Sequence, residues 1–163
     1  MTVSDRLREL GIELPAVAAP VADYVPAVRV GDLVYTSGQL PFVDGELDAV
    51  GKVREISAAG HSDTHGSVGP EDAKAAARIC ALNALAAIDD LVGIDNVERI
   101  VKVTGFVASD PGFTGQPGVL NGASELFGEV FGDAGRHARS AVGVNQLPLN
   151  APVEVEVIAQ VRS

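Results

Sequence analysis

The sequence predicts an α+β fold in which one mixed β-sheet carries two helices on one of its faces. Several segments alternate apolar and polar residues with the two-residue period of strands, and two longer segments repeat apolar residues at helical spacing. The elements follow one another in the order β-β-insertion-α-β-α-β-β. Because βα crossovers keep one hand, both helices are expected on the same side of the sheet.

The first part of the chain is expected to hold a helix, a connector and a β-hairpin. Residues 1–14 form a charged amphipathic pattern, with the helix at about 3–14. Residues 15–26 are rich in Pro and Ala, and Pro cannot donate the amide hydrogen bond that would continue a helix or a central strand. Residues 27–37 contain two β-rich runs around Gly31-Asp32, a turn signal that predicts a hairpin.

The middle of the chain combines an insertion with a long helix. Residues 44–70 are rich in Gly, Asp, Ser and His without periodicity, which predicts a surface insertion. A helix is expected to begin near Pro70, because Pro fits a first helical turn and the helix dipole favours Glu71 and Asp72 there. Apolar residues then recur at helical spacing over residues 73–91.

The second half of the chain supplies the remaining strands and the second long helix. Val and Ile alternate with polar residues in three segments, and one segment of helical spacing ends in a Gly-rich stretch. The predicted elements are a strand at 97–107, a Pro/Gly loop at 110–118, a helix at 119–131, and strands at 140–144 and 153–161.

Composition narrows the class of protein. A chain of 163 residues, 47% of them hydrophobic, is expected to form a single domain over residues 1–163 with an aliphatic core. The formal charge of -10 opposes binding to phosphate backbones, so nucleic acid is a disfavoured partner. No stretch approaches the roughly 20 apolar residues that span a membrane. The single cysteine, Cys80, and the lack of a signal-peptide pattern favour the reducing cytoplasm.

A sheet with only two long helices leaves one broad face open. In a chain this apolar, such a face is a surface that another chain is expected to cover. The sequence therefore predicts a closed homo-oligomer.

Arg139 and Glu154 are the candidate functional residues. Arg139 immediately precedes the predicted strand 140–144, at a sheet edge where its guanidinium can bind a carboxylate through two parallel hydrogen bonds. Glu154 and Glu156 alternate with valines, so both carboxylates face one side of the last strand, where one of them can activate a water molecule. From position alone, a surface salt bridge for Arg139 and a solvated face for the glutamates remain alternatives.

Other chemistries have weaker support. His61 and His65 have the spacing of two metal ligands on one helical turn, but their segment lacks helical character and a third ligand, so a solvated loop is the preferred interpretation. No phosphate-binding loop follows a strand, and no Gly-x-Ser-x-Gly elbow is present. A site built from Arg, Glu and bound water is the remaining hypothesis.

At this point the sequence resembles a known family over roughly residues 20–163. The resemblance is to the RidA/YjgF family, also labelled endoribonuclease L-PSP, and in particular to its longer subgroup. The segments that carry it are YTSGQLP (35–41), CALNALAAI (80–88), VKVTGFV (101–107) and ARSAVGV (138–144), followed by LPL (147–149) and VEVE (153–156).

The resemblance implies a chorismate-mutase-like fold in a homotrimer, with sites in the clefts between subunits. It also implies hydrolysis, without metal or cofactor, of reactive enamines and imines such as 2-aminoacrylate to 2-keto acids and ammonia. By matching position, Arg139 would hold the substrate carboxylate and Glu154 would activate water. The pocket would further be lined by Tyr24, Ser37, Gly38, Gln39 and Asn121.

Two departures and two alternatives accompany this hypothesis. The 44–70 insertion is longer than the family's short loop, and Ala141 stands where many members have cysteine. Tyr24 as a packed aromatic and Asn121 as a helix cap are the structural alternatives. An enamine/imine deaminase is ranked first, a non-catalytic protein that binds a small carboxylate second, and a ribonuclease third because of the negative charge.

Overall fold

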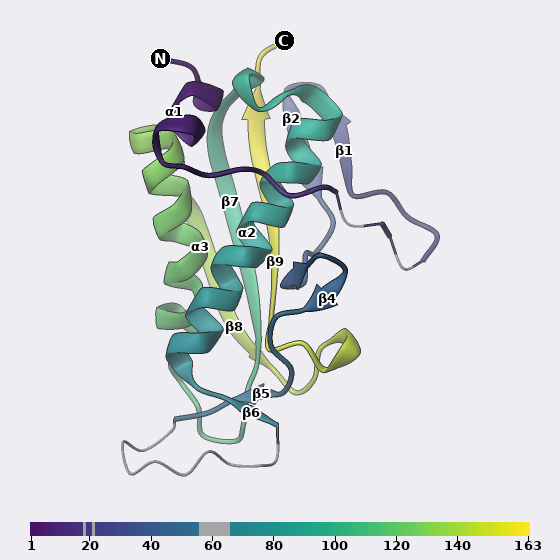
Figure 1. The fold of residues 1–163 in the computed structure, drawn as a ribbon, viewed down its shortest axis with the longest axis vertical. Helices are drawn as coiled ribbons and strands as arrows, with labels where there is room; N and C mark the ends of the chain where they lie inside the picture. Colours follow the sequence, from purple (N-terminus) through teal and green to yellow (C-terminus); the bar gives the residue numbers. More distant parts are fainter. Residues whose placement is uncertain (18, 21, 56–65) are drawn as a thin grey trace.

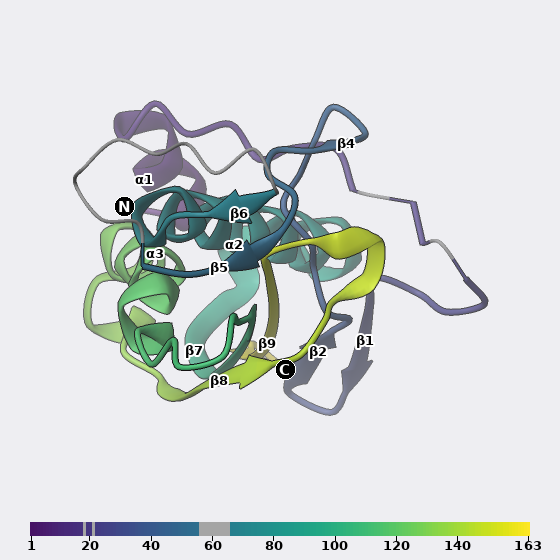
Figure 2. The same cartoon turned by 90° about the horizontal axis from the view of Figure 1, so that it is seen from below.

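The computed structural model describes residues 1–17, 19–20, 22–55 and 66–163, and it has the predicted mixture of helices and mixed sheet. Five strands form the main sheet in the order β1-β2-β9-β7-β8. Helices α2 and α3 lie together over one face of this sheet (Figure 1). The view from below shows the helix layer above the sheet layer (Figure 2). The expected placement of both helices on one face is confirmed.

The main elements occur in the predicted order. The helices are α1 Val3–Glu9, α2 Pro70–Val92 and α3 Gln116–Phe131, with short 3-10 turns η1 Ile94–Asn96, η2 Gly132–Gly135 and η3 Pro148–Asn150. The strands of the main sheet are β1 Ala27–Val30, β2 Leu33–Thr36, β7 Val97–Ala108, β8 Ala138–Val144 and β9 Val153–Val161. The minor strands are β3 Phe42–Val43, β4 Glu46–Leu47, β5 Lys52–Val53 and β6 Ser67–Val68.

Three predicted boundaries are wrong. The first helix ends at Glu9 rather than near residue 14, because Gly11 adopts a left-handed φ of 67° that ends the turn. Helix α3 begins at Gln116, inside the predicted Pro/Gly loop, because Pro117 occupies a first-turn position where its missing amide hydrogen does no harm. Strand β8 begins at Ala138, so Arg139 lies within the strand and not before it.

The 44–70 insertion is more ordered than predicted where it is described. Strand β4 pairs with β3, and β5 pairs in parallel with β6. The second pair is joined to the main fold, because Asp110 N donates to Val53 O at 3.0 Å. His61 and His65 lie outside the described residues.

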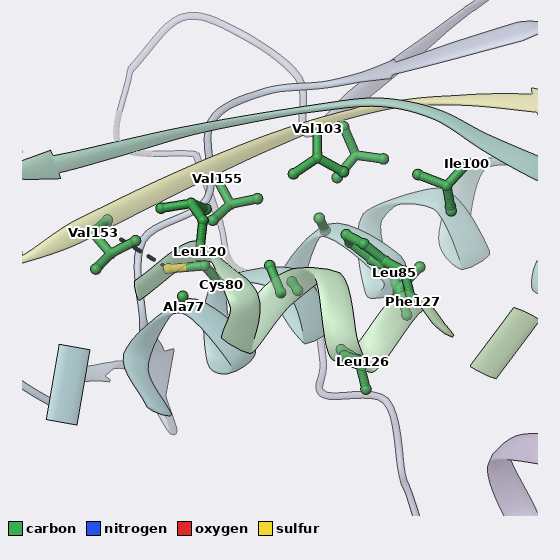
Figure 3. Packing of buried hydrophobic residues seen from close by; sticks show 14 of the residues in the cluster. Ala77, Cys80, Leu85, Ile100, Val103, Leu120, Leu126, Phe127, Val153 and Val155 are labelled. Carbon is green, nitrogen blue, oxygen red and sulfur yellow. Dashed lines mark hydrogen bonds between the residues drawn. The ribbon is translucent and has the colours of Figure 1, made fainter. Parts of the chain in front are cut away.

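Small side chains bring the helices close to each other and to the sheet. Seven alanines of α2 are buried, and the core in Figure 3 packs Leu85 and Phe127 beneath Ile100 and Val103. A Cβ added at Gly122 of α3 would overlap the carbonyl oxygen of Lys74 in α2. The backbones of the two helices are therefore in direct contact at Gly122.

The other face of the sheet has no cover from the described residues. The register places Val28, Tyr35 and Ile158 in one row across β1, β2 and β9, on the side away from the helices. Val28 is 47% exposed, Tyr35 40% and Val142 of β8 44%. Apolar side chains at this exposure on one continuous face are typical of a surface that binds protein.

The contact at Gly122 yields a stability prediction. Gly122→Ala is expected to lower the free energy of unfolding by about 1–3 kcal/mol, because the new methyl group forces the helix backbones apart. Gly128→Ala is the matched control on the same helix. Its Cβ meets nothing within 4 Å, so better helix propensity should raise stability by about 1 kcal/mol. Urea denaturation measures both values, and equal midpoints for the two variants would contradict the packing argument.

Candidate functional site

Arg139 projects from the edge strand toward the helices. It lies in β8 directly opposite Val103 of β7, which is fully buried beneath the helices. Paired residues on neighbouring strands share a face of the sheet, so Arg139 points to the same side. Its side chain reaches α3, where Nη1 donates hydrogen bonds to Asn121 Oδ1 at 2.8 Å and to Ser124 Oγ at 3.1 Å.

These two bonds leave the other edge of the guanidinium available. They engage both hydrogens of Nη1 and so fix the plane of the group. In the described parts of the chain, Nε and Nη2 of Arg139 have no hydrogen-bond partner. This edge matches the two oxygens of a carboxylate in planar, two-pronged geometry. The arrangement is a preorganised anchor for a small carboxylate.

A shallow pocket of about 380 Å³, open to solvent, includes this anchor in its lining. Its polar lining consists of the side chains of Asn121, Ser124, Arg136, His137 and Arg139. Gly128 leaves space beside the pocket, because a Cβ added there would meet nothing within 4 Å. A volume of this size suits a small metabolite.

Glu154 projects from the opposite face of the sheet. It lies on β9 opposite Phe106 of β7, whereas its neighbours Val153 and Val155 are buried beneath the helices. Successive residues of a strand alternate between faces, so Glu154 points to the open side. Partial burial, and then the charge of Glu156, raise the pKa of Glu154. A carboxyl group with a raised pKa is suited to proton transfer near neutral pH.

The segment after β2 packs directly against Glu154. Gln39 exchanges two backbone hydrogen bonds with Val155, at 2.8 and 3.0 Å, which fixes this segment beside β9. A Cβ added at Gly38 would overlap Oε1 of Glu154, so any larger residue at this position would displace the Glu154 carboxylate from where it lies. Gly38 and Gln39 therefore form a wall next to the Glu154 carboxylate.

Tyr24 reaches the same wall. A small pocket of about 40 Å³ is lined by Tyr24, Gly38 and Gln39 among other residues. Tyr24 is 46% exposed, so its ring is not packed in the core. The Ser37 hydroxyl donates to Val25 O at 2.6 Å and holds the Tyr24 segment in place. Its proton is thus already engaged within the chain.

The candidate residues form two groups in one chain. Arg139 and Asn121 lie together on the helix side of β8, and Tyr24, Gly38 and Gln39 lie together near Glu154. The register places the two groups on opposite faces, since Val103 and Phe106 are three residues apart on β7. A single chain does not bring Arg139 and Glu154 to one cavity.

Sequence reasoning missed Ser124 and His137. Ser124 lies one helical turn after Asn121, so it shares a face of α3 with that residue. His137 lies two residues before Arg139, a spacing that places both on one side of an extended chain. His137 Nε2 is 2.9 Å from Ser124 Oγ, and the imidazole Nδ1 is 2.6 Å from Gly135 O. The two spacings place Ser124 and His137 beside candidate residues, but they do not show that α3 meets β8.

The described residues contain no cluster of three or more His, Cys, Asp or Glu side chains that could hold a metal ion. Among the same residues, no helix is long and apolar enough to cross a membrane.

Comparison with known proteins identifies the family. The YjgF/chorismate mutase-like family model, whose description also carries the endoribonuclease label, matches residues 4–161. The chain belongs to the RidA/YjgF family. Protein TCP17 of Trypanosoma cruzi, a similar protein, is 43% identical over 163 residues, which cover 99% of this chain and 95% of that protein.

Two further proteins show the same fold or a named activity. The crystal structure of Atu1372 from Agrobacterium tumefaciens, a protein of unknown function, has a TM-score of 0.82 at 39% identity and covers 99% of this chain and 94% of that chain. A 2-iminobutanoate/2-iminopropanoate deaminase of Dermatophagoides farinae is 28% identical over 148 residues, 90% of this chain and 92% of that protein. RidA/YjgF relatives thus include a protein named as an imine deaminase.

The environment of Glu154 yields a prediction about its titration. Glu156→Gln is expected to lower the pKa of Glu154 toward the ordinary value of 4.5, because it removes a like charge on the same face. NMR titration of the Glu154 side-chain carboxyl carbon measures the change. Glu129→Gln, which removes a carboxylate paired with Arg78 on the helices, is the control and should leave the Glu154 pKa unaltered. An unchanged value in Glu156→Gln would contradict the assigned electrostatic cause.

Proposed function

We propose that the protein hydrolyses reactive enamines and imines of the 2-aminoacrylate class to 2-keto acids and ammonia. The observation that carries this proposal is the Arg139 guanidinium, held at Nη1 by Asn121 and Ser124, with its carboxylate-binding edge available. The D. farinae relative named as a 2-iminobutanoate/2-iminopropanoate deaminase supports the reaction class. Both substrates in that name carry a carboxylate beside an imine carbon.

The proposed reaction needs an anchor and a proton carrier. Arg139 binds the substrate carboxylate and so fixes the neighbouring imine carbon. Glu154 takes a proton from water as the water oxygen bonds to that carbon. The protonated Glu154 then returns this proton to the nitrogen, which gives a carbinolamine. As the carbon–nitrogen bond breaks, the proton of the carbinolamine hydroxyl passes to the nitrogen, so that ammonia leaves and the carbonyl forms. An enamine substrate enters the same sequence after it tautomerises to the imine by moving a proton from nitrogen to its methylene carbon. The raised pKa of Glu154 assists the first transfer, because it makes the carboxylate a stronger base toward water.

The opposite orientation of the two groups leads to a site between chains. We place Arg139 and Asn121 of one subunit against Glu154, Tyr24, Gly38 and Gln39 of its neighbour in a homotrimer. The exposed apolar face around Val28 and Tyr35 supports such an assembly, since another chain would remove it from water. Burial at that interface would also exclude bulk water from the reaction.

A second candidate function is capture of a small carboxylate without turnover. One observation favours it: a single chain contains the complete Arg139 anchor but carries Glu154 on the other face. Such a protein would bind 2-keto acids or amino acids without catalysis. A ribonuclease has less support, because a formal charge of -10 opposes contacts with phosphate.

The anchor can be tested by removing its charge. Arg139→Ala is expected to abolish the accelerated release of pyruvate from 2-aminoacrylate generated in situ, a loss of about a hundredfold or more in kcat/KM. A coupled keto-acid assay measures the rate. Arg78→Ala is the matched control, because Arg78 pairs with Glu129 on the outer surface of the helices. Full acceleration in Arg139→Ala would exclude the proposed role. Binding of pyruvate by wild type without turnover would favour capture instead.

The shared site can be tested by mixing two inactive variants. Arg139→Ala and Glu154→Gln subunits, each inactive alone, are co-refolded so that mixed trimers form. Random assortment restores roughly one site in four, so about a quarter of the wild-type activity is expected. Mixing without refolding is the control and should restore none. Absence of recovery in trimers shown to be mixed would place both residues of a working site in one chain.

A further inference from the structure

The residue that holds Arg139 is itself held by His137. Gly135 O can only accept a hydrogen bond, so Nδ1 of His137, 2.6 Å away, carries the proton in that contact. In the neutral ring, Nε2 is then an acceptor, and the Ser124 hydroxyl donates to it at 2.9 Å. A lone pair of the Ser124 oxygen accepts from Arg139 Nη1 at 3.1 Å. The bonds run in one direction from Arg139 through Ser124 and His137 to Gly135.

The far end of this chain of bonds is rigid. Gly135 is buried against α3, and a Cβ added there would overlap the carbonyl oxygen of Phe127. The His137 ring packs edge-on against the Phe127 ring, with centroids 5.7 Å apart and an interplanar angle of 89°. Burial, opposed by the bond to Gly135 and joined by the charge of Arg139, lowers the pKa of His137 and favours the neutral ring. Both the position and the charge state of the ring thus suit an acceptor.

We propose that His137 is a positioning residue that orients Arg139 through Ser124 and thereby sets the affinity for the substrate carboxylate. This inference rests on the proposed function of Arg139 as the carboxylate anchor. His137 touches neither substrate nor water in this role. It fixes which way the Ser124 hydroxyl points.

Loss of the acceptor would free the Ser124 hydroxyl to turn. Serine in a helix readily donates to the carbonyl four residues earlier, which here belongs to Leu120. The lone pair that meets Arg139 would then rotate away, and Asn121 alone would hold Nη1. With one bond instead of two, the guanidinium plane is no longer fixed. Binding of the carboxylate then requires that the free group first be ordered.

Two substitutions separate positioning from packing. In His137→Gln, the side-chain amide offers an acceptor to Ser124 and a donor to Gly135, but it loses the aromatic contact with Phe127. In His137→Phe, the aromatic contact is kept and the acceptor is lost. Positioning predicts that His137→Phe raises KM about fivefold to tenfold with kcat little changed, whereas His137→Gln stays near wild type. The reverse ranking, equal losses in both variants or no loss in either would overturn the inference.

A double substitution tests whether His137 acts through Ser124. In a Ser124→Ala background, the His137→Phe substitution is expected to have no further effect on KM, because the connecting hydroxyl is gone. A further severalfold loss in that background would show that His137 acts by another route and would overturn the inference.

A measurement without substrate keeps this inference separate from the proposed reaction. NMR detection of the Arg139 guanidinium should show slow rotation about its Nε–Cζ bond in wild type and His137→Gln, and faster rotation in His137→Phe and Ser124→Ala. If wild type releases no keto acid but this pattern holds, the deaminase proposal fails and the positioning role stands. Equal rotation in all four proteins would overturn the positioning role, whatever the activity.

Discussion

Two helices seal one face of the sheet, and the positions of all candidate residues follow from that asymmetry. The seal requires close contact, which Gly122 and the buried alanines of α2 allow. It brings α3 beside the edge strand β8, so Arg139 finds its partners on a helix rather than in solvent. The same alternation that sends Val153 and Val155 into the core sends Glu154 to the open face. The packing of both helices on one face therefore places Arg139 and Glu154 on opposite sides of the sheet.

Glu154 destabilises the folded chain at neutral pH. Its folded pKa is raised above 4.5, so the folded state holds this proton more tightly than the unfolded state does. The stabilisation from this group is fully present below pH 4.5 and is lost as the pH rises through its folded pKa. At neutral pH the charged carboxylate, half buried beside Glu156, opposes folding. The raised pKa of Glu154 does not stabilise a single folded chain at neutral pH. It does suit a residue that transfers protons.

The sequence predicted the secondary-structure elements better than it predicted which elements contact one another. The hairpin around Gly31-Asp32 and the strand 153–161 could be located, because turn chemistry and two-residue alternation are local signals. The start of α3 was missed because Gly and Pro indicate a loop as readily as a first helical turn. Ser124 was missed for a different reason. Its role depends on the contact of α3 with β8, which no local pattern encodes.

Assembly and chemistry are linked through the open face. The row of Val28, Tyr35 and Ile158 crosses the same side of the sheet from which Glu154 projects. In the proposed trimer, a neighbour that covers this row also removes water from Glu154, and desolvation disfavours the charged carboxylate. Its pKa would then rise further than in the single chain, while the neighbour's guanidinium, if it approaches the carboxylate, would oppose that rise. A substrate carboxylate bound to the guanidinium neutralises this opposing charge. Binding of substrate would thus raise the pKa of Glu154 again, in the complex in which the reaction takes place.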